Sequence, residues 1–268
     1  MKISSNSIIE AGFDMVFEDS ARLEVSLKGV KEPITFSALS NVKLDVVILE
    51  HDIKNHINFH VNDGASVNLY LISDKEESEF NILGDVKNNG VFNVYLADLS
   101  NVNTSVNSNV ILLGDNSSGE FKFSSIVGQN IKKLYNIGFN HLGVKTSSNF
   151  EGYGVALKNG EIDAKGISHI EKNSIKSYAN QMVKVILFDK ESKAKASPTL
   201  KIDCDDIVAN HACAIGSLNE DHIFYLKSRG LSEEEARRLI TLGYLIPIEN
   251  YFDEKGKETI ESYIKENF

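Results

Sequence analysis

The sequence predicts a mainly β protein that ends in a small helical part, and three observations support this. Short apolar alternations of about strand length recur from Val42 to Gly216, separated by Asn, Gly, Asp and Ser residues. No stretch in that range has helical spacing long enough for a βαβ crossover. After Gly216 the spacing becomes that of short capped helices. The strand pattern alone leaves open a sandwich, a barrel or a stack of short parallel rungs.

The composition is that of an ordinary globular protein of 268 residues, with 42% hydrophobic and 25% charged residues. A net charge of −10 argues against a broad nucleic-acid surface, because neutralising phosphates requires a basic one. We find no apolar run long enough to span a bilayer, and the first residues make a poor signal peptide. Two cysteines do not suggest a disulfide-stapled secreted protein, so we expect a cytoplasmic protein.

Residues 1–36 are expected to form an N-terminal cap segment ahead of a strand core at 37–216. Leu23, Val25 and Leu27 alternate with polar residues, as in a half-buried strand. Stacked strand repeats need a cover at each end of the stack, and this segment is in the right place to supply one.

Residues 217–268 are expected to be helical, because two capping boxes lie in this region. Ser217 stands three residues before Glu220, and Ser232 stands three residues before Glu235. In a capping box the serine accepts from a free amide of the first turn, and the glutamate reaches back to the serine amide. We therefore expect one helix to start at each serine.

Glycines and apolar spacing complete the prediction for these helices. Gly230 and Gly243 are candidates for the left-handed residue that ends a helix. Pro247 ends what precedes it, and 258–268 is typical of a last amphipathic helix. We expect the first helix to pack on the end of the strand domain through Ile223, Phe224 and Leu226.

Four motifs follow one another from Asp205 onward: an acidic pair, a strand centred on a histidine, a helix that ends in Ser-Arg-Gly, and a helix that begins Ser-Glu-Glu-Glu-Ala-Arg. They occupy Asp205–Asp206, Asn210–Ala212, Asn219–Gly230 and Ser232–Arg238. In this order and spacing the run resembles the end of the core of the SufB/SufD family, the scaffold proteins of iron–sulfur cluster assembly. The segments around Gln181–Asp189 and Ser197–Asp203 are similar to the preceding family strands.

The resemblance implies a right-handed parallel β-helix over 37–216 and a small C-terminal helical domain over 217–268. It also implies a non-catalytic scaffold that carries a transient iron–sulfur cluster and works with a SufC-like ABC ATPase docked on the C-terminal helices. A sulfur donor and a cluster acceptor would be further partners, and we expect neither nucleic acid nor membrane among them. The chain has no Walker A run, so we expect it to bind no nucleotide itself.

Cysteine and histidine are the residue types that ligate iron or accept sulfur, and Cys204, His211 and Cys213 lie close together in the sequence. In an extended strand, His211 and Cys213 point to the same face, whereas Cys204 has the opposite parity. We name these three, with Asp205, as candidate metal and cluster ligands. The resemblance implies the role of His211, because the matching histidine of the SufD-type partner takes part in cluster assembly. Alternatively, Cys213 is a small buried core residue.

The sequence departs from the family at the position of an essential thiol. SufB-type proteins carry a cysteine on an earlier strand, and Met182 stands there instead, which makes the chain SufD-like. The sequence also lacks the long N-terminal helical region of both relatives, so we expect a minimal form. Because one chain cannot complete a four-ligand site, we expect a homodimer through the last rungs, with Cys204 or Cys213 replacing the thiol. A heterodimer with a paralogue stays open.

The second capped helix runs into an apolar stretch that exceeds the needs of one packing face. We expect its residues to bind the ATPase, with internal packing as the alternative: Leu239, Ile240, Leu242, Tyr244 and Leu245. Two other functions stay open, a β-helix enzyme that acts on polysaccharide and a purely structural β-solenoid. The enzyme would need a carboxylate pair at a suitable spacing, which we do not find, and the solenoid leaves the capped helices unexplained.

Overall fold

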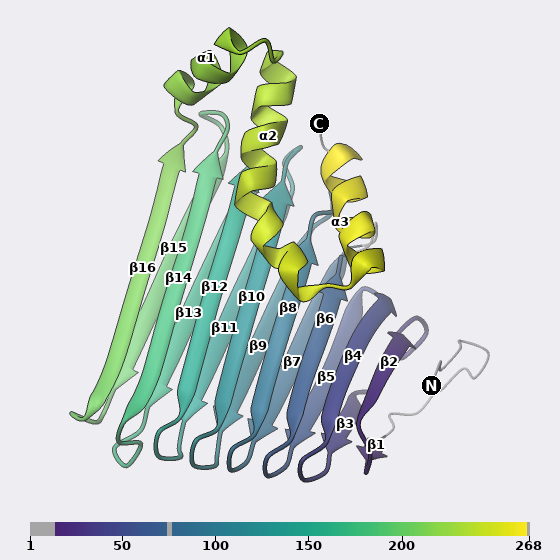
Figure 1. The fold of residues 1–268 in the computed structure, drawn as a ribbon, viewed down its shortest axis with the longest axis vertical. Helices are drawn as coiled ribbons and strands as arrows, with labels where there is room; N and C mark the ends of the chain where they lie inside the picture. Colours follow the sequence, from purple (N-terminus) through teal and green to yellow (C-terminus); the bar gives the residue numbers. More distant parts are fainter. Residues whose placement is uncertain (1–13, 74–76, 267–268) are drawn as a thin grey trace.

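The chain folds into a parallel β-helix of two sheets, with helices laid along one face (Figure 1). The computed structural model describes residues 14–73 and 77–266. Consecutive strands alternate between the two sheets, and every strand pair in the described part of the chain is parallel. The β-helix expected from the resemblance is therefore confirmed, and a barrel or an antiparallel sandwich is excluded.

The two sheets contain eight strands each and are named here by their strand numbers. The odd sheet consists of β1 (Asp14–Phe17), β3 (Ile34–Ala38), β5 (Lys54–Val61), β7 (Ser78–Val86), β9 (Thr104–Leu112), β11 (Lys132–His141), β13 (Glu161–Ile170) and β15 (Lys193–Ile202). The even sheet consists of β2 (Ala21–Ser26), β4 (Lys43–Glu50), β6 (Ser66–Ile72), β8 (Val91–Asp98), β10 (Ser118–Val127), β12 (Ser147–Ala156), β14 (Ser177–Leu187) and β16 (Ile207–Ser217). The helices are α1 (Glu220–Ser228), α2 (Glu233–Leu245), the 3₁₀ helix η1 (Ile246–Tyr251) and α3 (Glu254–Glu266).

The N-terminal segment enters the sheets before residue 37. β1 pairs with β3, and β2 pairs with β4, so the described part of 1–36 supplies strands to the first rungs of both sheets. Leu23 and Val25 lie on β2 and point into the core, as their alternation predicts. Residues 1–13 of the expected cap segment, and with them the start examined for a signal peptide, lie outside the described residues.

The core lies between the sheets because alternate strand residues point inward and stack on their equivalents in the next rung. Phe36 stacks in this way on Phe59, with ring centroids 5.3 Å apart, and Phe59 packs across the core against Phe92 of the even sheet, with ring centroids 4.8 Å apart. The strands lengthen from four residues in β1 to eleven in β14. This growth explains why the sequence shows no strict repeat.

Asparagine stabilises both the rungs and the turns. Side-chain ladders run along the stack: Asn93 donates to Asn68, and Asn136 donates to Asn107, each at 2.9 Å. Other asparagines occupy left-handed turn positions, which this residue tolerates better than most. They include Asn41, Asn89, Asn116, Asn130 and Asn159.

The helices cover the even sheet at the ends of its strands, as Figure 1 shows for α2 and α3. Strands β8, β10 and β12 end in consecutive buried residues instead of alternating ones, because those ends are covered on both faces. A second apolar cluster forms there, in which Leu245, Ile260 and Ile264 are fully buried. The last helix, expected over 258–268, begins at Glu254 and docks on the protein's own core, and residues 267–268 lie outside the described part.

The predicted helix boundaries are right in part. Ser232 and Glu235 form the expected capping box, and Gly230 has the expected left-handed conformation, with a φ of 98°. The predicted box at Ser217 is wrong: Ser217 still pairs with Leu187 as the last residue of β16, and Asn219 caps α1. Gly243 does not end a helix either.

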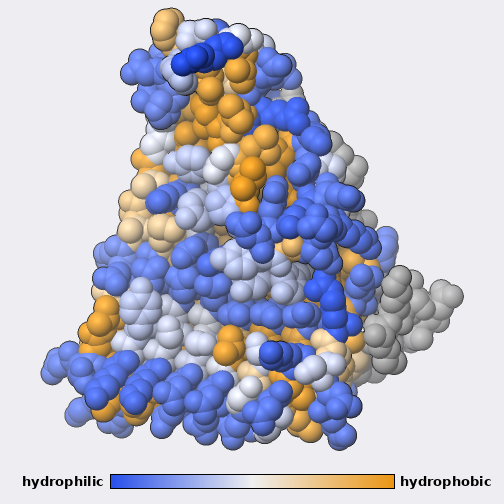
Figure 2. All heavy atoms as spheres, viewed as in Figure 1, coloured by the Kyte–Doolittle hydropathy of each residue, from blue (hydrophilic) through white to orange (hydrophobic). Residues whose placement is uncertain are grey.

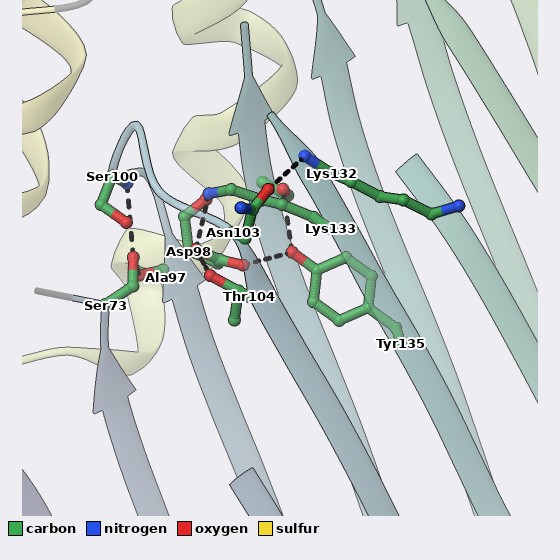
Figure 3. Close-up of polar contacts among 10 residues, drawn as sticks. Ser73, Ala97, Asp98, Ser100, Asn103, Thr104, Lys132, Lys133 and Tyr135 are labelled. Atoms are coloured by element: carbon green, nitrogen blue, oxygen red, sulfur yellow. Dashed lines mark hydrogen bonds and ion pairs between the residues drawn. The ribbon is translucent and has the colours of Figure 1, made fainter. Parts of the chain in front are cut away.

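A buried polar network joins the C-terminal end of β8 to the N-terminal end of β11 (Figure 3). Lys133 donates to the Asp98 carboxylate at 2.6 Å and to the Asp98 carbonyl at 2.9 Å. Tyr135 and Thr104 donate to the same carboxylate at 2.5 and 3.2 Å, and both members of the Lys133–Asp98 ion pair are fully buried. Burial lowers the pKa of Lys133, and the Asp98 carboxylate opposes that shift.

Candidate functional site

The β-helix is open at its C-terminal end. β15 and β16 are the outermost strands of the odd and even sheets, so each has a neighbour on one side only (Figure 1). Their inward positions are exposed or half-buried, whereas the equivalent positions one rung earlier are buried. No further strand or helix of the described residues covers these edges. An open edge with apolar inward positions is a surface that pairs readily with another chain.

The two open edges differ in their charge. β15 carries Lys193, Lys195 and Lys201 on its outward face and Pro198 within the strand. Lysine and proline on an edge strand oppose pairing with another strand. β16 has no charged residue from Ile207 to Ser217. The free edge of β16 is therefore the one suited to strand pairing.

His211 and Cys213 lie in the middle of β16, and their parity is as predicted. His211 pairs in register with Gln181, and Cys213 pairs with Val183. Gln181 and Val183 are buried inward residues, so His211 and Cys213 also point toward the interior of the β-helix. Both are nevertheless exposed, because β16 is the last strand. Cys213 as a buried core residue, the alternative drawn from its apolar neighbours, is wrong.

Cys204 and Asp205 lie elsewhere, in the turn between β15 and β16. Cys204 is half-buried, and Asp205 is exposed. Four strand residues separate the start of β16 from His211, which is roughly 13 Å at the rise of a strand. One chain therefore brings His211 and Cys213 together but leaves Cys204 and Asp205 apart from them.

Gln181 and Met182 lie on β14, the strand that pairs with β16 next to His211 and Cys213. Gln181 donates to Ser168 at 2.8 Å and to the Thr199 carbonyl at 3.1 Å, but its buried Oε1 has no hydrogen-bond partner. Met182, where the resemblance places the thiol of SufB-type proteins, has the opposite parity and pairs with Ala212. A thiol at Met182 would therefore point to the other face of the even sheet from Cys213.

The predicted partner-binding residues divide between the core and the surface. Leu245 is fully buried, while Ile240, Leu242 and Tyr244 pack partly buried against the second apolar cluster. Leu239 remains 49% exposed. Most of this apolar stretch therefore holds α2 on the even sheet.

Two aromatic residues of α1 are more exposed than any of these. The predicted packing of Phe224 against the strand domain is wrong: Ile223 is the buried residue of α1, whereas Phe224 is 75% and Tyr225 56% exposed. Figure 2 shows apolar side chains gathered over α1 and α2. Beside them a cavity of about 660 Å³ is lined by both helices and the loop after β14. Helical periodicity gave no signal for this exposure, because α1 buries only one residue.

One group of possible metal ligands was missed by the sequence reasoning. His169, Glu171 and Asp203 offer ligand atoms that lie within 4.8 Å of one another, and they form the one such group among the described residues. His169 and Glu171 have the i, i+2 spacing of one strand face, which was the available signal.

No described helix is long and apolar enough to cross a bilayer.

Comparison with known proteins gives a consistent result. Residues 47–244 match the family described as SUF system FeS cluster assembly, SufBD core domain. The chain is 31% identical over 156 residues to the iron–sulfur cluster assembly protein SufD of Bacillus subtilis, which covers 58% of this chain and 36% of that protein. It is 22% identical over 247 residues to a SufBD family iron–sulfur cluster assembly protein of Staphylococcus haemolyticus, covering 92% of this chain and 51% of that one.

A SufBD family protein of Mycobacterium tuberculosis is 28% identical over 139 residues, covering 52% of this chain and 16% of that protein. The chain thus spans about half or less of the length of these curated relatives. The family match includes β16, α1 and most of α2, and so contains the open edge, His211 and Cys213.

Proposed function

Because the chain belongs to the SufBD core family and so has a role in iron–sulfur cluster assembly, we propose that it is a scaffold subunit that holds the nascent cluster at the open end of its β-helix. The observation that carries the proposal is the exposed His211–Cys213 pair on the uncharged edge strand β16. Imidazole nitrogen and thiolate sulfur are ligands that iron–sulfur clusters accept. The scaffold has no catalytic turnover of its own, and its free cysteines suit a cytoplasmic location.

A second copy of the chain completes the site. One chain offers one histidine and one cysteine at this edge, which is too few for a cluster. A two-fold axis normal to the sheets would set β16 antiparallel to its copy and generate each ligand twice. If all eleven residues of β16 pair, the axis passes at the strand midpoint, Ala212. His211 of one protomer then lies opposite the partner's Cys213.

The edge residues favour this contact. Ala212 and its neighbours Ala209 and Ala214 are small, so two strands can approach without obstruction. The lysines and Pro198 of β15 make the other edge the weaker pairing surface. A paralogue with a similar edge would give a heterodimer by the same geometry.

The C-terminal helices bind an ABC ATPase like SufC. Helices α1 and α2, which lie at the C-terminal ends of the even-sheet strands, expose the apolar residues Phe224, Tyr225 and Leu239. Charged side chains such as Lys227, Glu233 and Arg237 lie beside them around the cavity. An apolar patch with a polar rim is typical of a protein–protein interface. Docking here would let nucleotide-driven movement of two ATPase subunits act on two scaffold subunits.

Anaerobic reconstitution with Fe²⁺ and sulfide tests the cluster site. His211→Ala and Cys213→Ser should each weaken iron retention by about tenfold or more, as loss of a metal ligand does. Both side chains are exposed, so the melting temperatures should stay close to wild type. His222→Ala, another exposed histidine but on α1, is the matched control and should retain the wild-type iron content.

Two outcomes would overturn the proposal. Wild-type iron retention by both single variants would remove the site from β16. Unfolding of His211→Ala would show that the residue supports the fold. The family match favours the scaffold over the polysaccharide-active enzyme, and an exposed ligand pair favours it over a purely structural solenoid.

A further inference from the structure

We propose that His169, Glu171 and Asp203 form a second site, separate from the cluster site, that binds a single divalent transition-metal ion. The three residues lie at the ends of β13 and β15, at the opposite end of the strands from the helices (Figure 1). None of them belongs to β16. The inference does not rest on the proposed scaffold function, because it concerns ion binding by the chain alone.

The geometry brings two carboxylates to one imidazole. Nε2 of His169 lies 2.8 Å from Oδ2 of Asp203, and Nδ1 lies 3.4 Å from Oε1 of Glu171. One donor atom from each residue lies within 4.8 Å of the other two. Ligands about 2.0–2.2 Å from an ion are roughly 3–4 Å apart. One ion binds only one ring nitrogen, so closing the group requires rotations that bring one carboxylate round to the nitrogen that the other carboxylate already faces. The carboxylates can make them, because Glu171 is 40% and Asp203 43% exposed.

The backbone fixes the positions from which these side chains extend. The amide of Asp203 donates to the Ile170 carbonyl at 2.9 Å, and the amide of Glu171 donates to the His141 carbonyl at 3.1 Å. The turn after β15 is thereby held against the end of β13. Ligands on rigid elements lose little conformational entropy on binding, which favours affinity.

The donor set determines the class of ion. One imidazole nitrogen with carboxylate oxygens suits first-row divalent ions such as Fe²⁺, Co²⁺ or Zn²⁺ rather than Ca²⁺ or Mg²⁺, which prefer oxygen ligands alone. Three protein ligands leave further coordination positions for water, as at exchangeable sites rather than closed structural ones.

Lys201 opposes binding and so provides a test with a predicted sign. Its ammonium lies 3.7 Å from Oδ2 of Asp203, where it competes with an incoming cation. Removing this positive charge should tighten metal binding by about five- to tenfold. If Lys201 only filled space beside the three proposed ligands, its replacement would not tighten metal binding.

The experiment is isothermal titration of the untagged chain with Co²⁺. It uses a Cys204→Ser, His211→Ala, Cys213→Ser background, so that the other candidate ligands are absent. One ion per chain should bind. His169→Gln and Asp203→Asn should each weaken binding at least about tenfold, and Lys201→Gln should tighten it.

His60→Gln is the matched control, because His60 is an exposed histidine that pairs with Asp85 on the same face of the odd sheet. It should bind Co²⁺ as the background does. The proposal fails if His169→Gln binds as tightly as His60→Gln, or if Lys201→Gln binds no tighter than the background. If His169→Gln unfolds, the exposed Glu171→Gln decides, since unchanged binding by that variant also overturns the site.

Discussion

Replacing Lys133 with methionine should destabilise the protein severely while leaving its surface unchanged. The ammonium of Lys133 makes two hydrogen bonds to Asp98, and both side chains are fully buried. Lys133→Met leaves the Asp98 carboxylate with only the neutral donors Tyr135 and Thr104. Removing one partner of a buried ion pair costs about 3–5 kcal/mol. For a chain of this size we expect a melting temperature about 6–20 °C lower.

The control for this prediction is the preceding residue. Lys132 pairs with Glu161 at 2.8 Å but points outward (Figure 3), so Lys132→Met should cost far less. The measurement is urea unfolding followed by circular dichroism, with equal m values for both variants. Adding Asp98→Asn to Lys133→Met should recover most of the loss, because no buried charge then remains unpaired. Equal unfolding free energies for the two lysine variants would refute the reasoning.

Three further predictions follow from the structure. The free energy of unfolding should fall by about 3 kcal/mol as pH drops from 6.5 to 4. Burial lowers the pKa of His141 to about 4, so the unfolded chain alone takes up the proton in that range. In a series of urea titrations at different pH values, His141→Asn should flatten this part of the pH dependence. If the proposed homodimer forms, Ala212→Lys should shift it to monomer in sedimentation, whereas Ser197→Lys on the other edge should not. Phe224→Ser should weaken ATPase pull-down without lowering the melting temperature, since the ring is exposed.

Deleting the C-terminal helices would not isolate their proposed role in ATPase docking. Removing residues 232–268 would uncover the second apolar cluster, in which Leu245, Ile260 and Ile264 are fully buried. Loss of that much apolar contact would destabilise the even sheet, so lost binding could not be assigned to lost docking.

The sequence determined the type of most elements because their patterns are local. Strand alternation, asparagine-rich turns and the Ser232 capping box all depend on neighbours within one turn or strand. The errors arose where distant contacts decided the outcome. Ser217 and Asn219 are both good cap residues, and the ladder to Leu187 keeps Ser217 in the strand. Gly243 does not end α2, because the helix continues to Leu245, which packs on the even sheet.

For the candidate site, the sequence predicted that His211 and Cys213 share one face of their strand, but it did not predict that both side chains are exposed. Period-two alternation placed His211 and Cys213 on one face, and this is confirmed. Whether that face is covered depends on β16 being the last strand of its sheet, which no local pattern reports. Lys133 is the opposite case: it alternates in phase with the buried Tyr135, so the sequence did carry a signal for its inward position.

The proposed replacement of the SufB-type thiol by Cys213 fits the proposed interface between two copies of the chain. A cysteine at Met182 would lie one strand back from the edge and on the opposite face from His211. Cys213 instead lies on the edge strand, two residues from His211 and on the same face. Two-fold symmetry acting on that edge turns one histidine and one cysteine into two of each, arranged so that each histidine meets a thiol. The same symmetry acting on Met182 would leave the two side chains separated by both β16 strands.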